Sequence, residues 1–147
     1  MSRGIIALVL LLSLGAGGCG SRGGARAPVV VTDVWSRASP QGASVGVLYM
    51  TLTSAHGDRL IAVTVPAALA GHAEMHGVYH DPSGRLAMRA LEAVDLPPRA
   101  PVAFHPGALH IMLMDLVKPL TAGERFDVTL RFRDAGEQVV SAVVRDE

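Results

Sequence analysis

The clearest pattern of hydrophobic and polar positions lies in residues 125–132, where the two kinds alternate one by one. The apolar positions are Phe126, Val128, Leu130 and Phe132. Because successive side chains of a β-strand point to opposite faces, this alternation predicts a strand with one face in a core and the other in solvent. Residues 45–53 also fit a strand, but both of its faces are apolar, so we expect it to lie centrally in a sheet.

Nine short segments fit a strand pattern, and turn-forming residues separate them. They are residues 29–35, 45–53, 59–65, 73–80, 85–91, 102–104, 110–114, 125–132 and 138–144. The Ala-rich stretch 66–71 is bounded by Pro and Gly too tightly for a real helix, so almost no α-helix is expected. About nine short strands with frequent turns favour an all-β fold, an antiparallel β-sandwich with Greek-key connections.

The turn at residues 81–84, Asp-Pro-Ser-Gly, predicts how the segments on either side of it pair. Pro at the second position and Gly at the fourth are typical of a type I turn closed by a left-handed glycine, a three-residue hairpin loop with a bulge. In that register His76 lies opposite Ala90, and Val78 lies opposite Met88. His76 and Met88 are then diagonal neighbours on one face, about 7 Å apart at Cβ, so their side chains can meet at one ion. A two-residue loop with Pro82 and Ser83 at its tip would instead shift the register by one and put the two side chains on opposite faces.

The segment 110–114 places an uncommon set of donors on one face of a predicted strand. His110, Met112 and Met114 share that face, whereas the two residues between them are ordinary core material. An imidazole and two thioethers are neutral, fairly soft donors that suit a soft cation such as Cu(I). Methionine also fills gaps in cores, and a lone histidine beside it is more often structural, so this segment needs partners from elsewhere to form a metal site.

Composition and charge exclude several classes of function. The chain has 147 residues, of which 50% are hydrophobic, a size suited to one globular domain. The net charge is zero and no Lys/Arg cluster occurs, which argues against a nucleic-acid partner. Cys19 is the only cysteine. An internal disulfide, a blue-copper site with a thiolate ligand and a catalytic thiol are therefore excluded.

The N-terminal residues predict export and a membrane anchor. Arg3 precedes an apolar run that is too short to span a bilayer, and small residues then lead to Cys19, as in a secretory signal. Residues 16–19, Ala-Gly-Gly-Cys, resemble a bacterial lipoprotein box, in which the cysteine becomes the lipidated first residue. We predict a signal peptide at 1–18, a flexible tether at 19–28 and a domain at 29–147, held on the extracytoplasmic side of a membrane by a lipid on Cys19.

The spacing His-x11-Met-x21-His-x-Met, formed by His76, Met88, His110 and Met112, resembles the copper-binding signature of the PCu(A)C family of periplasmic copper chaperones. Other segments are similar to recurrent segments of that family: residues 34–38, 48–52, 106–107, 110–114 and 118–120, with Gly123. The chain departs from the family at two positions. Gly77 stands where the family often has Met, although Met75 precedes His76, and Asp115 stands where Gly is usual.

The resemblance implies a cupredoxin-like β-sandwich that binds Cu(I) through His76, Met88, His110 and Met112. It also implies delivery of copper toward the binuclear centre of cytochrome c oxidase, without enzymatic activity. The implied acceptor is a thioredoxin-like assembly protein or subunit II of the oxidase. Met75, His80 and Met114 are further donors that assist only if the fold brings them to the ion.

Other classes of function also fit the sequence. One is a general copper storage or sequestration lipoprotein, and another is a structural or partner-docking lipoprotein without metal. A redox enzyme that uses copper is disfavoured, because the domain lacks the usual cysteine ligand and a thioether-rich site favours Cu(I).

Overall fold

The structure is a computed structural model that describes residues 27–146, and within that range it contains ten strands and no helix. The strands are β1 (Val30–Arg37), β2 (Val45–Thr53), β3 (Asp58–Thr64), β4 (Ala70–His80), β5 (Leu86–Leu91), β6 (Val94–Leu96), β7 (Val102–Phe104), β8 (His110–Leu116), β9 (Arg125–Phe132) and β10 (Gly136–Arg145). The predicted signal peptide, Cys19 and most of the predicted tether lie outside the described residues. Within those residues, no helix has the length and hydrophobicity needed to cross a membrane.

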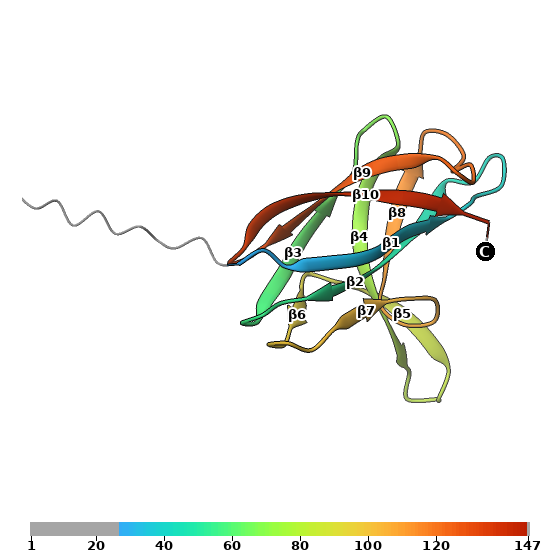
Figure 1. The fold of residues 1–147 in the computed structure, drawn as a ribbon. Coiled ribbons are helices and arrows are strands. Elements are labelled where there is room, and N and C mark those ends of the chain that lie inside the picture. Colours follow the sequence, from blue (N-terminus) through green and yellow to red (C-terminus); the bar gives the residue numbers. More distant parts are fainter. Residues whose placement is uncertain (1–26, 147) are drawn as a thin grey trace, which may run out of the picture.

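The strands form one open sheet in the order β5-β4-β8-β2-β1-β10-β9-β3-β6, and β7 pairs with β2 off this path. The all-β prediction is confirmed, and β2 is central as expected, since it pairs with β1, β7 and β8. One pair of strands departs from the antiparallel pattern: β1 and β10 run parallel, side by side (Figure 1). A parallel pair needs a long connection, and β1 and β10 have the whole domain between them.

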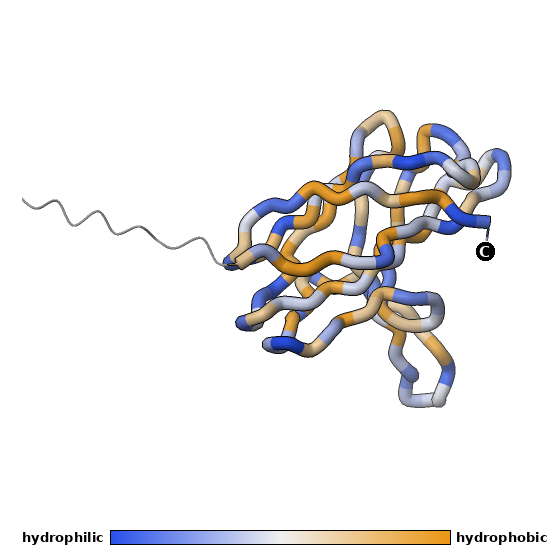
Figure 2. The backbone as a smooth tube through the Cα atoms, viewed as in Figure 1, coloured by the Kyte–Doolittle hydropathy of each residue, from blue (hydrophilic) through white to orange (hydrophobic). Residues whose placement is uncertain are grey.

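The sheet folds over on itself and encloses one hydrophobic core. Its largest fully buried side chains come from strands far apart in the sheet and include Leu48, Ile111, Leu130 and Phe132. The alternation predicted for β9 is confirmed, since Val128 and Leu130 are buried whereas Arg125 and Arg131 are exposed. Figure 2 shows apolar residues along the strands of the body and polar residues at the C-terminal end.

The strand β6 was not predicted from the sequence. It has only three residues, Val94, Asp95 and Leu96, and it pairs with β3 at the edge of the sheet. Its two apolar side chains are buried and Asp95 is exposed. Such a short alternation cannot be distinguished from a loop in the sequence, because its burial depends on a partner strand more than thirty residues away.

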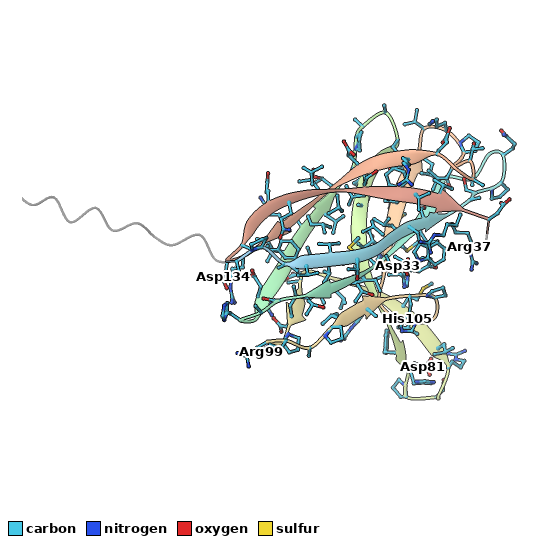
Figure 3. All side chains as sticks on the ribbon, viewed as in Figure 1. Asp33, Arg37, Asp81, Arg99, His105 and Asp134 are labelled. Atoms are coloured by element: carbon cyan, nitrogen blue, oxygen red, sulfur yellow. The ribbon has the colours of Figure 1, made fainter. Side chains whose placement is uncertain are left out.

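The hairpin of β4 and β5 has the predicted register. Its turn is closed by a hydrogen bond from the Gly84 N–H to the Asp81 carbonyl at 2.8 Å, and Gly84 has a φ of 81°. His76 lies opposite Ala90, and Val78 lies opposite Met88. The hairpin projects from the body of the domain, with Asp81 near its tip (Figures 1 and 3).

Asp58 joins β3 to the turn between β9 and β10. This carboxylate is 6% exposed and accepts backbone N–H groups from Arg59 at 2.7 Å, Asp134 at 2.9 Å and Ala135 at 2.9 Å. The sequence marks Asp58 only as part of a turn. A buried carboxylate that accepts three backbone N–H groups joins β3 firmly to this turn, so it is expected to stabilise the fold.

We therefore expect Asp58→Ala to lower the free energy of unfolding by about 2–3 kcal/mol, because it leaves the three N–H groups without their acceptor. Urea denaturation measures this change. The control is Asp95→Ala, which removes an exposed carboxylate 2.7 Å from Arg59 and should cost less than about 1 kcal/mol. Equal losses in the two variants would contradict the role assigned to Asp58.

Candidate metal centre

The pairing of β4 with β8 brings the predicted ligands to one face of the sheet. His76 lies directly opposite His110 in this antiparallel ladder, and Glu74 lies opposite Met112. The alternate residues of the same strands, such as Met75 and Ile111, are buried in the core. Since strand faces alternate, the two histidines and Met112 lie on the outer face of the sheet, which we call the ligand face.

His76 is the central residue of this set. Its ring and that of His110 have centroids 5.8 Å apart and planes inclined by 31°. Met88, on β5, and Met112, on β8, are its diagonal neighbours on opposite sides, because His76 pairs with Ala90 on one strand and His110 on the other. Diagonal neighbours on one face lie about 7–8 Å apart, which long thioether side chains can span.

His110 is oriented by a hydrogen bond within the turn that precedes β8. Its side chain is buried, at 7% exposure, and its Nδ1 lies 2.8 Å from the Ala108 carbonyl oxygen. A carbonyl oxygen only accepts, so Nδ1 carries the proton and donates. The Nε2 of His110 is therefore left with a free lone pair that can bind a metal ion.

His76 also has one nitrogen paired and one free. Its Nε2 lies 2.9 Å from the Glu74 Oε2, whereas its Nδ1 is buried and has no hydrogen-bond partner. Within residues 27–146, this Nδ1 is the only buried side-chain nitrogen or oxygen that lacks a hydrogen-bond partner. Because buried polar atoms normally have partners, an unpaired nitrogen beside a second imidazole fits a position reserved for a metal ion.

Acidic residues lie on one side of the histidine pair. Glu74 Oε1 is 3.2 Å from the Nε2 of His72, and the Nδ1 of His72 is 3.6 Å from Asp115 Oδ2. The hydrogen bond with His76 lowers the pKa of the Glu74 carboxyl, and His72 lowers it further against the effect of burial. Glu74 is therefore an ionised acceptor at neutral pH.

The two methionines differ in exposure. Met88 is 60% exposed on the projecting hairpin, whereas Met112 is half-buried on β8. A surface pocket of about 280 Å³ is lined by Glu74 and Ala90, among others, but by none of the four predicted ligands. The predicted ligands thus lie on an open face rather than in a deep pocket.

The chemistry of this face depends on its thioethers. In the described part of the chain, no group of three or more His, Cys, Asp or Glu side chains could hold a metal ion. A hard cation that requires oxygen ligands, or Zn²⁺ in an all-nitrogen or thiolate site, has no suitable set there. Two imidazole nitrogens and two thioethers remain, and they suit Cu(I).

The other candidate donors fall into two groups. Met75 is 6% exposed and lies in the core, so it faces away from the histidine pair and cannot assist them. Met114 lies on the ligand face opposite His72, one position beyond Met112 on that face, and is half-buried. His80 lies on the same face of β4 as His76, but it is exposed near the tip of the hairpin, beyond Met88.

Both departures from the family pattern have a structural account. Asp115 has a φ of 56°, a left-handed conformation that favours glycine and that aspartate tolerates better than most residues. Position 77 alternates with His76, so Gly77 lies on the opposite face, where an added Cβ would be 3.2 Å from Leu91. A methionine there would not extend the ligand set.

Glu74 was missed by the sequence reasoning. Its only signal was the position two residues before His76, which places both residues on the same strand face. Without the pairing of β4 to β8, that spacing does not show which imidazole the carboxylate contacts.

The family model described as "Putative lipoprotein LpqE-like" matches residues 29–144. A relative named "Putative lipoprotein Lxx21020", from Leifsonia xyli subsp. xyli, is 29% identical over 125 residues, which cover 80% of this chain and 70% of the relative. Both names describe lipoproteins.

Similar solved structures are PCuAC domains, which share a cupredoxin-like β fold. The apo PCuAC domain from PmoF1 has a TM-score of 0.68 and 29% identity, covering 83% of this chain and 97% of that domain. The copper-bound PCuAC domain from PmoF2 has a TM-score of 0.67 and 28% identity, covering 84% and 97%. The Cu(I) form of DR1885 from Deinococcus radiodurans has a TM-score of 0.65 and 26% identity, covering 86% and 84%.

Proposed function

The chain belongs to the LpqE-like family of lipoproteins, and on that premise we propose that it is an extracytoplasmic copper chaperone. It binds one Cu(I) through His76, Met88, His110 and Met112 and passes the ion to an acceptor protein. The observation that carries this proposal is that His76 lies directly opposite His110 on neighbouring strands. The Nδ1 of His76 has no hydrogen-bond partner, and the bond from His110 Nδ1 to the Ala108 carbonyl leaves the Nε2 of His110 unprotonated. The copper-bound PCuAC domain and the Cu(I) form of DR1885 support the proposal, since both share this fold.

The ligand set suits a carrier better than a redox enzyme. Two neutral imidazoles and two thioethers leave the ion with its single positive charge, and no thiol has to lose a proton during loading. An acceptor with thiolate ligands binds Cu(I) more strongly than thioethers do, so copper can pass to it by exchange of ligands without a change of oxidation state. Met88 is the most exposed of the four ligands, so it is the one that an acceptor thiolate can replace first.

We further propose that the acceptor takes part in assembly of the binuclear copper centre of cytochrome c oxidase. A thioredoxin-like assembly protein or subunit II of the oxidase fits, because either would offer thiolates to the ion. We also place the domain outside the cytoplasmic membrane, attached by a lipid on Cys19, since the residues up to Cys19 resemble a lipoprotein box.

A transfer experiment tests the carrier role against copper storage. The whole chain is loaded with one equivalent of Cu(I) and mixed, under reducing and oxygen-free conditions, with the copper-binding domain of oxidase subunit II or with a thioredoxin-like assembly protein. We expect the copper to move to the acceptor, as measured by metal analysis after separation of the two proteins. Retention of copper on this chain in the presence of excess acceptor would favour storage.

We expect Met88→Leu to weaken Cu(I) binding about ten-fold with little change in thermal stability. Leucine has nearly the shape of methionine but lacks a donor atom, and residue 88 is 60% exposed. Competition with a Cu(I) chelator measures the affinity, and thermal unfolding measures the stability. The matched control is Met114→Leu, which removes a thioether from the same face; a larger loss in that variant would mean that Met114, not Met88, is the ligand.

A further inference from the structure

Glu74 lies between two imidazoles on the ligand face. Its Oε2 is 2.9 Å from His76 Nε2, and its Oε1 is 3.2 Å from His72 Nε2. Glu74 precedes His76 by two residues on β4 and lies opposite Met112 on β8, so the carboxylate is next to the predicted copper site without belonging to the proposed ligand set.

This contact determines which nitrogen of His76 carries the proton. An ionised carboxylate has only acceptor atoms, so the His76 nitrogen that faces it has to be the donor. Neutral imidazole carries one proton, so a proton on Nε2 leaves Nδ1 as the lone-pair nitrogen. Nδ1 is also the buried atom of His76 that has no hydrogen-bond partner.

The two histidines therefore use opposite nitrogens. His110 donates through Nδ1 to the Ala108 carbonyl, which leaves Nε2 free. His76 donates through Nε2 to Glu74, which leaves Nδ1 free. Metal-binding histidines usually donate their second nitrogen to a carboxylate or a carbonyl, and here each histidine has one of these two partners.

Resting on the copper-binding function proposed above, we propose that Glu74 is a positioning residue: its carboxylate holds His76 as the Nε2–H tautomer and so presents Nδ1 as the atom that binds Cu(I). Glu74 acts on the ring of His76 and does not touch the ion. The carboxylate also makes His76 a stronger donor, because an imidazole that donates a hydrogen bond to an anion is more basic at its other nitrogen.

The substitution Glu74→Gln tests this proposal. The amide has nearly the shape of the carboxylate, but it can donate to a bare Nε2 as well as accept from Nε2–H, so it no longer selects one tautomer. The matched control is Glu124→Gln, in the connection between β8 and β9. Glu124 pairs with Lys118 at 3.2 Å, and its side chain has the same 39% exposure as that of Glu74.

The first readout is nitrogen-15 NMR of the imidazole rings in the whole chain without copper. In the parent protein and in Glu124→Gln, we expect the His76 signals of a ring protonated at Nε2. In Glu74→Gln, we expect the signals to shift toward a mixture of tautomers. This measurement reports the tautomer directly and does not depend on whether the protein binds copper.

The second readout is Cu(I) binding measured by competition with a chelator. We expect Glu74→Gln to weaken binding about ten-fold and Glu124→Gln to leave it unchanged. On loading the parent protein with Cu(I), the Nδ1 signal of His76 should move most. An Nδ1–H tautomer in the parent protein, copper bound at Nε2 of His76, or unchanged tautomer and affinity in Glu74→Gln would each overturn the proposal.

These results also separate this proposal from the proposed function. If the parent chain fails to bind Cu(I) at all, the proposed copper function is wrong. The NMR signals still show, in that case, whether Glu74 holds His76 as the Nε2–H tautomer. If the parent chain binds Cu(I) and Glu74→Gln binds it equally well, only the role of Glu74 fails.

Discussion

Replacement of His110 with alanine is expected to weaken Cu(I) binding by at least about 100-fold. In the proposed site His110 binds Cu(I) through Nε2, which is left unprotonated because Nδ1 donates to the Ala108 carbonyl oxygen. Loss of a residue that only supports a ligand typically costs 10–100-fold in metal affinity. His110 is buried and held in one orientation, unlike the exposed Met88, so its loss should reach or exceed the upper end of that range. Competition between the protein and a Cu(I) chelator measures the change.

His105→Ala is the matched control for this prediction. His105 is in the turn just before β8, and its Nδ1 lies 3.0 Å from the Pro106 carbonyl oxygen, so it resembles His110 in its local hydrogen bond (Figure 3). It differs in being exposed and outside the ligand face. We expect this variant to bind Cu(I) normally, and similar losses in both variants would show that the turn, rather than the His110 nitrogen, supports binding.

The second large effect concerns the membrane. Cys19→Ser is expected to release the protein from the membrane fraction and to block lipoprotein processing, because serine offers no thiol for attachment of the lipid. Fractionation of cells that express each form, followed by mass measurement of the mature N-terminus, gives the result. A single acyl chain holds a protein only weakly, so stable attachment in the parent protein should depend on more than one chain at Cys19.

The copper site provides the control for that experiment, since Cys19 precedes in the sequence all the strands that carry the predicted ligands. Purified Cys19→Ser protein should bind Cu(I) with the affinity of the parent. A variant that is still attached to the membrane and normally processed would replace the lipoprotein hypothesis with ordinary cleavage of a signal peptide, and the copper proposal would be unaffected.

Much of the fold could be predicted because the strands carry their own signals. β2, β7 and β9 have the predicted bounds, since alternation or a flanking turn marks each of them clearly. The hairpin register was predicted from the turn at residues 81–84, and the left-handed Gly84 of a three-residue loop is observed rather than the two-residue loop that would shift the pairing by one.

The parts of the fold that the sequence did not predict depend on contacts distant in sequence. The three residues of β6 become a strand only through pairing with β3, and the parallel pairing of β1 with β10 joins the two ends of the domain. Sequence periodicity reports which face of a strand is buried but not which strand lies beside it.

The candidate site, like the fold, was predicted from the sequence only in part. The hairpin register placed His76 and Met88 on one face, and alternation placed His110 with Met112. Only the pairing of β4 with β8 shows that the two histidines are direct neighbours, and this pairing cannot be read from either strand alone. For the same reason, the contact between Glu74 and His76, with the unpaired nitrogen that it leaves, appears only in the structure.

The most direct test of the copper site is X-ray absorption at the copper edge on the whole chain, reduced and loaded with one equivalent of Cu(I). Two imidazole nitrogens and two thioether sulfurs should give a mixed nitrogen and sulfur shell, and the sulfur contribution should fall in Met88→Leu. A shell of nitrogen or oxygen alone, or no retention of stoichiometric Cu(I), would contradict the site formed by His76, Met88, His110 and Met112.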